Sequence, residues 1–296
     1  YGVLNRQRST LRALKALGIR AKVVHMNEGH CAFAGLERLV QIVEEHGIDL
    51  KAALQIVPRT TIFTTHTPVA AGHDEFPAEM VRPCLKPLAE RLKTTERELL
   101  SWGQAQGASE SGPVSMFILG VRLSAACNGV SQLHGSVARR MWAHLWPGRP
   151  VEEIPISHIT NGVHVATFVS HEFANLFDRY LGPDWYLGSQ RPDNIRRIDE
   201  IYNEDLWRAH ELNRSRLVRT CREQLVRQYQ RRNAPRGVLE NVEKALDPGI
   251  LTIAFARRFA TYKRAFLLLQ DPQRLEALIN HPKMPVQFIF AGKAHP

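Results

Sequence analysis

The stretch Ile250-Leu251-Thr252-Ile253-Ala254-Phe255-Ala256 decides the fold. A continuous apolar run of this length is typical of a strand buried on both faces of a parallel sheet. Residues Thr261 to Ile279 follow with helical periodicity, and Val286-Gln287-Phe288-Ile289-Phe290-Ala291 is a second run of the same kind. Strand, crossover helix and strand predict a βαβ unit of a doubly wound α/β fold.

The preceding residues repeat this alternation. Ala21–Met26 is β-prone and precedes a stretch whose apolar residues recur at helical spacing, and Thr60–Thr65 is a β-branched run that ends at His66-Thr67-Pro68. Residues 77–146 read as mostly helical, with breaks at 107–113 and at Asn128-Gly129. Ile154–Thr160 predicts a further strand, which places Asn161 at a strand end.

Composition excludes several classes of protein. The 296 residues are 44% hydrophobic and 23% charged, as in globular proteins, and Lys+Arg 39 against Asp+Glu 29 gives a net charge of +10. The sequence has neither an apolar run of membrane-spanning length nor a signal peptide, so we expect a cytoplasmic protein. We also expect four reduced cysteines, because no C-x-x-C pair occurs. Both ends interrupt expected elements, which predicts an internal fragment.

The basic excess concentrates between Arg191 and Arg236, in a predicted helix from about Glu204 to Arg232. A solvated arginine face, a nucleic-acid surface and an anion site are all compatible with it. The apolar side of this helix is expected to carry Trp207, Leu217, Cys221, Leu225 and Tyr229.

Ligands of open parallel sheets bind beyond the carboxyl ends of the strands, where the segment Arg257–Arg264 lies. Four cations here would repel one another and the positive end of the following helix, so we expect a phosphate or another dianion, against the alternative of a solvated basic turn.

Polar residues also follow the earlier strands. The spacing of His25, Glu28 and His30 does not match a zinc motif, so no metal is predicted. Ligand-lining polar groups and plain turn chemistry, with Asn27 capping the next helix, remain open as alternatives. The sequence contains no Walker loop, no G-x-G-x-x-G and no G-x-S-x-G.

Six segments, in this order along the chain, together resemble the α-glucan phosphorylase family of glycogen, starch and maltodextrin phosphorylases. The bacterial and archaeal branch is the more similar. The segments are His25–Phe33, Phe63–Val69 with Gly72-His73-Asp74, Asn128–Gly135, Thr160–His164, Arg257–Arg264 and Phe290–Pro296.

The resemblance implies two Rossmann-like domains of the GT-B glycosyltransferase type with the active site in the cleft between them. Residues 1–162 would be the end of the N-terminal glucan-binding domain, and 163–296 the opening of the C-terminal cofactor and phosphate domain. It also implies pyridoxal 5′-phosphate, whose phosphate acts beside substrate orthophosphate. The implied reaction releases α-glucose 1-phosphate from α-1,4-glucan with retention.

Roles follow from the same resemblance. Arg258 would bind substrate phosphate, Lys263 would lie beside both phosphates, and Arg257 would contact the cofactor phosphate, where animal enzymes have lysine. His66 and Asn161 would hold the glucosyl unit, His66 through its main-chain carbonyl. Arg258, Lys263 and His66 are the predicted catalytic residues, and Glu28 and His30 are expected to line the sugar pocket.

One departure limits the expected activity. The family anchors its cofactor on a lysine in a Gly-Thr-Gly-Asn-x-Lys segment, and residues 1–296 contain none. We therefore expect the isolated chain not to turn over glucan. A nucleotide-sugar glycosyltransferase of the same architecture is the alternative enzyme, and a basic nucleic-acid-binding protein is the alternative outside enzymes; we expect no nucleic-acid or membrane partner. The sequence leaves the oligomeric state open.

Overall fold

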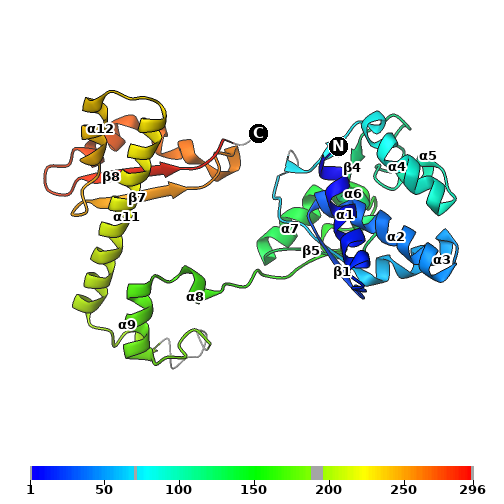
Figure 1. The fold of residues 1–296 in the computed structure, drawn as a ribbon, viewed down its shortest axis with the longest axis horizontal. Helices are drawn as coiled ribbons and strands as arrows, with labels where there is room; N and C mark the ends of the chain where they lie inside the picture. The colour runs from blue at the N-terminus through cyan, green and yellow to red at the C-terminus, as the bar shows by residue number, and fades with distance from the viewer. Residues whose placement is uncertain (1, 70–71, 188–195, 295–296) are drawn as a thin grey trace. The chain divides into compact units, whose positions relative to one another are not determined.

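A computed structural model describes residues 2–69, 72–187 and 196–294 and divides the chain into two compact units, Tyr1–Gly162 and Val163–Pro296 (Figure 1). The division into domains that the resemblance implies also lies after Gly162. The roles predicted for residues 1–162 and 163–296 stay predictions. Each unit is described by itself.

The first unit is built on a four-stranded parallel sheet. In the order of the sheet its strands are β1 (Val24–Asn27), β2 (Thr61–Thr64), β5 (Ala126–Gly129) and β6 (Ile156–His158). The register aligns Asn27 with Thr64 and Thr64 with Asn128. Residues that end different strands are therefore neighbours at one edge of the sheet.

Helices cover this sheet, and some of them begin at a capping side chain. Asp49 accepts a hydrogen bond from Ala52 N at 2.7 Å to start α3, and Ser131 accepts one from His134 N to start α7. Two short strands, β3 (Glu75–Phe76) and β4 (Val114–Ser115), pair antiparallel beside them. The helices are α1 (Gly2–Ala16), α2 (Ala32–His46), α3 (Leu50–Ile56), α4 (Ala78–Leu92), α5 (Glu96–Ser101), α6 (Met116–Arg122) and α7 (Gln132–Met141), with 3-10 turns η1 (Gly29–Cys31), η2 (Pro58–Thr60), η4 (Ala143–Leu145) and η5 (Val151–Glu153).

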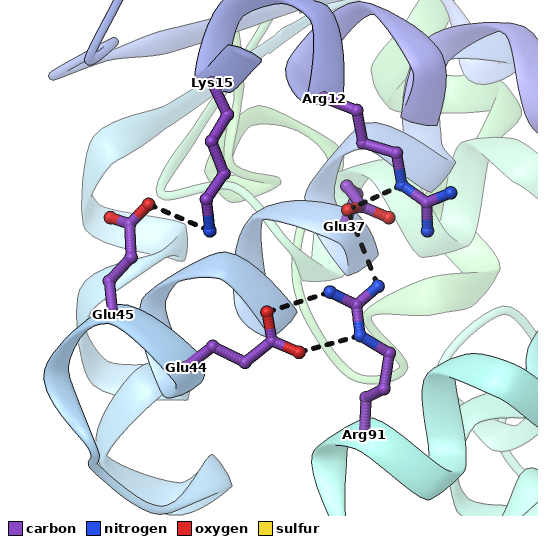
Figure 2. Close-up of polar contacts among 6 residues, drawn as sticks. All are labelled: Arg12, Lys15, Glu37, Glu44, Glu45 and Arg91. Atoms are coloured by element: carbon purple, nitrogen blue, oxygen red, sulfur yellow. Dashed lines mark hydrogen bonds and ion pairs between the residues drawn. The ribbon is translucent and has the colours of Figure 1, made fainter. Parts of the chain in front are cut away.

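The core of the first unit is apolar, but a buried carboxylate joins three of its helices. Phe33, Phe63 and Phe117 are fully buried. The Glu37 side chain on α2 is 1% exposed, and its Oε1 lies 3.0 Å from Arg12 Nε on α1 and 3.8 Å from Arg91 on α4 (Figure 2). Arg91 also donates to both carboxylate oxygens of Glu44 and Lys15 pairs with Glu45, so ion pairs fasten α1 and α4 to α2.

The second unit carries the predicted parallel strand pair. Strand β7 (Leu251–Ala256) pairs with β8 (Val286–Ala291) along its whole length. The long helix α11 (Asn203–Arg231) matches the predicted bounds. The unit also contains α8 (Val165–Phe168), α9 (His171–Leu181), α12 (Arg236–Glu243), η6 (Thr261–Lys263), η7 (Ala265–Gln270) and α13 (Pro272–Ile279).

Three details of the second unit differ from the predictions. The expected helix from Thr261 to Ile279 is two 3-10 segments followed by α13, because Arg264 adopts the left-handed conformation (φ 58°) and breaks the helical path. The strands are not buried on both faces: Leu251 is 59% exposed and Phe290 47%. A pair of strands has too few neighbours in the described residues to cover them.

The predicted apolar side of α11 is confirmed only in part, because Cys221, Leu225 and Tyr229 are half-buried. Trp207 and Leu217 are 55% and 44% exposed, whereas Ala209 and Val218 are buried. Ala209 belongs to a small apolar cluster with Leu176 and Ile201, and Leu206 packs against this cluster. Strand β5 was not predicted: it lies in the region predicted to be mostly helical, at the break Asn128-Gly129. The two-residue strands β3 and β4 were not predicted either.

The described residues thus form a mixed α/β structure with parallel strands in both units, which confirms the fold class; the finer prediction of two Rossmann-like halves stays a prediction. No disulfide bond joins the four cysteines, all of which lie in the described ranges. None of the helices in the described ranges is long and apolar enough to span a membrane.

Candidate functional site

Polar residues gather at the carboxyl edge of the four-stranded sheet, where β1, β2 and β5 end. Glu28 follows β1 directly and its backbone N–H donates to Thr64 O at 2.8 Å. Thr65, directly after β2, donates from its backbone N–H to Asn128 O at 3.0 Å. These bonds continue the ladder beyond the strands and hold the ends of three strands together.

Side chains extend the same connection. The Thr64 hydroxyl donates to Asn128 Oδ1 at 3.0 Å, and His25 Nε2 lies 2.6 Å from Thr64 Oγ1. A hydroxyl has one proton, so Thr64 accepts from His25, and the His25 proton is on Nε2. The Asn128 amide nitrogen then donates to Gly129 O at 3.1 Å.

Glu28 holds the turn that follows β2. Its Oε1 accepts the backbone N–H of His66 and, at 2.9 Å, the hydroxyl of Thr67. The Glu28 backbone has φ 71° and ψ 165°, a region that is essentially reserved for glycine. A non-glycine residue keeps such a conformation only where the surrounding structure fixes it.

The His66 ring is fixed by Asn27. His66 Nε2 lies 2.6 Å from Asn27 Oδ1, which can only accept, so the ring donates from Nε2. The alternative in which Asn27 caps the next helix is wrong, since the N-cap of α2 is Cys31. The alternative of ligand-lining polar groups at a strand end stays a prediction.

His73 is a member of this cluster that the sequence hardly distinguished. It hydrogen-bonds the Thr67 backbone, and its ring packs edge-on against Phe117 and Trp142 at centroid distances of 5.3 and 5.0 Å. Burial lowers the pKa of His73. Its place in the short segment Gly72-His73-Asp74, seven residues after His66, was the only signal available.

The other predicted sugar-binding residues lie at the same edge. His30 is exposed in η1, two residues after Glu28. Asn161 is exposed beyond β6, and its backbone N–H donates to Val130 O at 3.1 Å, just past β5. Glu28, His30, His66 and Asn161 are thus distributed over the ends of three strands at one edge of the first unit.

The predicted phosphate segment lies at the corresponding edge of the second unit. The residues after β7 and β8 are joined there: Phe259 N donates to Lys293 O at 2.9 Å. A Cβ on Gly292 would lie 2.0 Å from Arg257 O, so only glycine fits between the two segments. Arg257 and Arg258 are exposed beside this junction.

The expectation that the macrodipole of a following helix adds to the positive charge of this segment is wrong. Lys263 lies in η6, a three-residue 3-10 turn, so no α-helix begins here and no macrodipole adds to the charge of Arg257, Arg258, Lys263 and Arg264. Lys263 is half-buried, with Nζ 4.9 Å from the centroid of the Tyr262 ring. Within the described ranges no cluster of three or more His, Cys, Asp or Glu side chains could hold a metal ion.

Similarity to known proteins identifies the family of the chain. Residues 3–296 match the sequence model of the carbohydrate phosphorylases. The chain belongs to the carbohydrate phosphorylase family. A maltodextrin phosphorylase of Thermococcus litoralis is 42% identical over 97% of this chain and 33% of its own length.

Two further phosphorylase relatives match over similar ranges. A glycogen phosphorylase of Mycobacterium tuberculosis is 39% identical over 93% of this chain and 32% of its own length, and one of Aquifex aeolicus is 30% identical over 97% and 41%. The chain therefore spans about a third of the length of the curated relatives.

Proposed function

We propose that this phosphorylase-family chain is part of an α-1,4-glucan phosphorylase, a retaining glycosyltransferase that uses orthophosphate to release α-glucose 1-phosphate from glycogen, starch or maltodextrin. The match to the family over residues 3–296 is the observation that carries the proposal. The relatives named maltodextrin and glycogen phosphorylase support the substrate class.

The first unit would bind the sugar. We assign the glucosyl unit to the main-chain carbonyl of His66 and to the Asn161 side chain, with Glu28 and His30 lining its pocket. Hydroxyl groups need donors and acceptors at fixed positions, and the hydrogen bonds at the carboxyl edge of this sheet supply such rigidity.

The second unit would bind phosphate. Arg258 is assigned to substrate phosphate, Lys263 to both phosphates and Arg257 to the phosphate of the cofactor. Guanidinium groups can bind phosphate oxygens in pairs, and a flexible ammonium group suits a position between two anions. The cations reduce the repulsion that would otherwise oppose bringing two phosphates together.

Pyridoxal 5′-phosphate fits this donor set, because Arg257 and Lys263 offer the cationic hydrogen-bond donors that its phosphate requires. When bound, it would supply a second phosphate as a proton relay beside orthophosphate. The bond from the anomeric carbon to the leaving glucan oxygen breaks, that oxygen gains a proton from orthophosphate, and a phosphate oxygen bonds the anomeric carbon on the same face. Arg258 and Lys263 would hold orthophosphate for both events.

The test uses the full-length protein that contains this chain, supplied with maltodextrin, orthophosphate and pyridoxal 5′-phosphate. We expect glucose 1-phosphate to form only with the cofactor. Arg258→Met should raise the KM for phosphate about 10- to 100-fold, because it removes a charge-assisted contact. Arg274→Met, a matched change of an exposed arginine on α13, should leave it unchanged.

Two outcomes would reject this proposal. Turnover of a nucleotide sugar without cofactor would favour the alternative glycosyltransferase, which would place a diphosphate on the same cations. Equal phosphate KM values in the Arg258 and Arg274 variants would remove the assigned role. The isolated chain is expected to release no glucose 1-phosphate, since the lysine segment that anchors the cofactor is not among its residues.

A further inference from the structure

We propose that Glu28 is a positioning residue, whose carboxylate acts on the reaction through His66. On this view Glu28 fixes the turn His66-Thr67, so that the His66 carbonyl has one orientation toward the glucosyl unit. The inference rests on the proposed function and deepens it, because it distinguishes His66, which binds the glucosyl unit, from Glu28, which fixes the orientation of His66.

The contacts of Glu28 lie on both sides of that carbonyl. Its Oε1 accepts the backbone N–H of His66, which precedes the carbonyl, and the hydroxyl of Thr67, which follows it, at 2.9 Å. The peptide between His66 and Thr67 is planar, so fixing its two neighbours leaves the carbonyl little freedom to rotate. A carboxylate oxygen suits this task because its lone pairs can accept both hydrogen bonds at once.

A second residue, His73, contacts the same turn. His73 hydrogen-bonds the Thr67 backbone and packs against Phe117 and Trp142, which stack at 3.8 Å. Phe117 is fully buried on α6, so this support is anchored in the core. Glu28 and His73 both contact the turn that contains His66, and together they form the clamp on this turn.

The backbone conformation of Glu28 indicates that a glutamate side chain is needed at this position. Its φ of 71° and ψ of 165° are costly for any residue with a Cβ, and glycine would adopt them freely. The conformation continues the ladder through the bond from Glu28 N to Thr64 O at 2.8 Å. A strained glutamate at a place that suits glycine indicates that its carboxylate contributes what glycine would lack.

Three variants of the full-length protein separate positioning from direct sugar contact. Glu28→Gln keeps an oxygen that can accept both hydrogen bonds and loses the charge, whereas Glu28→Ala loses both. Glu28→Gly also loses both but relieves the backbone strain, so it replaces the alanine variant if that one does not fold. Glu79→Ala, at an exposed glutamate of α4, is the matched control.

We expect Glu28→Ala and Glu28→Gly to lower kcat/KM for glucan about 10- to 100-fold, the usual cost of a misplaced contact, with the KM for orthophosphate unchanged. Glu28→Gln should rescue most of this loss, since its side-chain oxygen can still accept both hydrogen bonds. A glutamine variant as impaired as the alanine variant would overturn the inference in favour of a direct, charge-dependent contact. Unchanged kcat/KM in the alanine and glycine variants would overturn it as well.

Amide hydrogen exchange of peptides covering residues 62–69 tests the clamp without any activity. Exchange should accelerate about tenfold or more in Glu28→Ala or Glu28→Gly and stay at the wild-type rate in Glu28→Gln and Glu79→Ala. If the variants show this pattern of exchange but the wild-type protein does not phosphorolyse glucan, the proposed function fails and the clamp stands. If exchange is the same in all variants, the clamp fails whatever the activity.

Discussion

Removing both guanidinium groups from the buried Glu37 carboxylate should destabilise the first unit by more than the two single losses together. Arg12 Nε lies 3.0 Å and Arg91 3.8 Å from Glu37 Oε1, and the Glu37 side chain is 1% exposed (Figure 2). At an effective dielectric constant of about 20, each attraction is about 4–6 kcal/mol before desolvation is subtracted. Because the Arg12 and Arg91 side chains are 50% and 35% exposed, the net value of each is far smaller.

We expect Arg12→Met and Arg91→Met each to cost about 1 kcal/mol, because the other arginine still faces the carboxylate. The double variant should cost about 3 kcal/mol, because the buried carboxylate then loses both of these arginines. The difference is a coupling of at least about 1 kcal/mol. Adding Glu37→Met to the double variant should recover most of the loss, since no charge then remains buried.

The opening free energy of α2, from amide hydrogen exchange of the full-length protein, measures this coupling. Arg91 also pairs with Glu44, so a Glu44→Gln variant is needed to subtract that contact. Additive single losses, or a triple variant no more stable than the double, would show that the Glu37 charge is not held by these two arginines.

Two further predictions concern the strand edges. Gly292→Ala should separate the segments after the two strands of the second unit, because its Cβ would lie 2.0 Å from Arg257 O; we expect a loss of about 1–3 kcal/mol and a raised phosphate KM, whereas Gly237→Ala, with no atom within 4 Å, should change neither. Burial holds the pKa of His73 below its ordinary value of 6.5 in the folded state, and it outweighs the hydrogen bond to the Thr67 backbone and the nearby acidic groups, which raise the pKa. The unfolded chain therefore binds the proton first as pH falls, and the free energy of unfolding should drop below pH 6.5. Denaturant unfolding at pH 7.5 and 5.5 should show a smaller drop for His73→Gln; equal drops would contradict it.

The sequence predicted those elements whose pattern is local. Apolar runs identified β7 and β8, and β-branched residues identified β2. Strand β5, Ala126–Gly129, was missed because its four residues have weak strand preference and become a strand through pairing with β2 and β6. Burial in the second unit was overestimated, because an apolar run shows only that a strand could be buried. Whether it is buried depends on the elements that pack against it.

The candidate site followed the same division. Strand ends could be predicted, so Glu28, His66 and Asn161 were placed at the correct edge. The clamp on the His66 turn could not be predicted, because it depends on the register between β1 and β2 and on a left-handed backbone at Glu28. No local pattern marks a glutamate for such a conformation. His73 was undervalued for a related reason: its partners Phe117 and Trp142 come from distant parts of the chain.

The hydrogen bonds from His25 through Thr64 to Asn128 have a direction, and this gives the sheet edge a polarity. Each group donates to the next, so reversing one bond would require a new histidine tautomer, a rotated hydroxyl and a flipped amide at the same time. The amide is further committed by its donation to Gly129 O. The three side chains consequently change orientation together, and a ligand that binds this edge meets one fixed pattern of donors and acceptors.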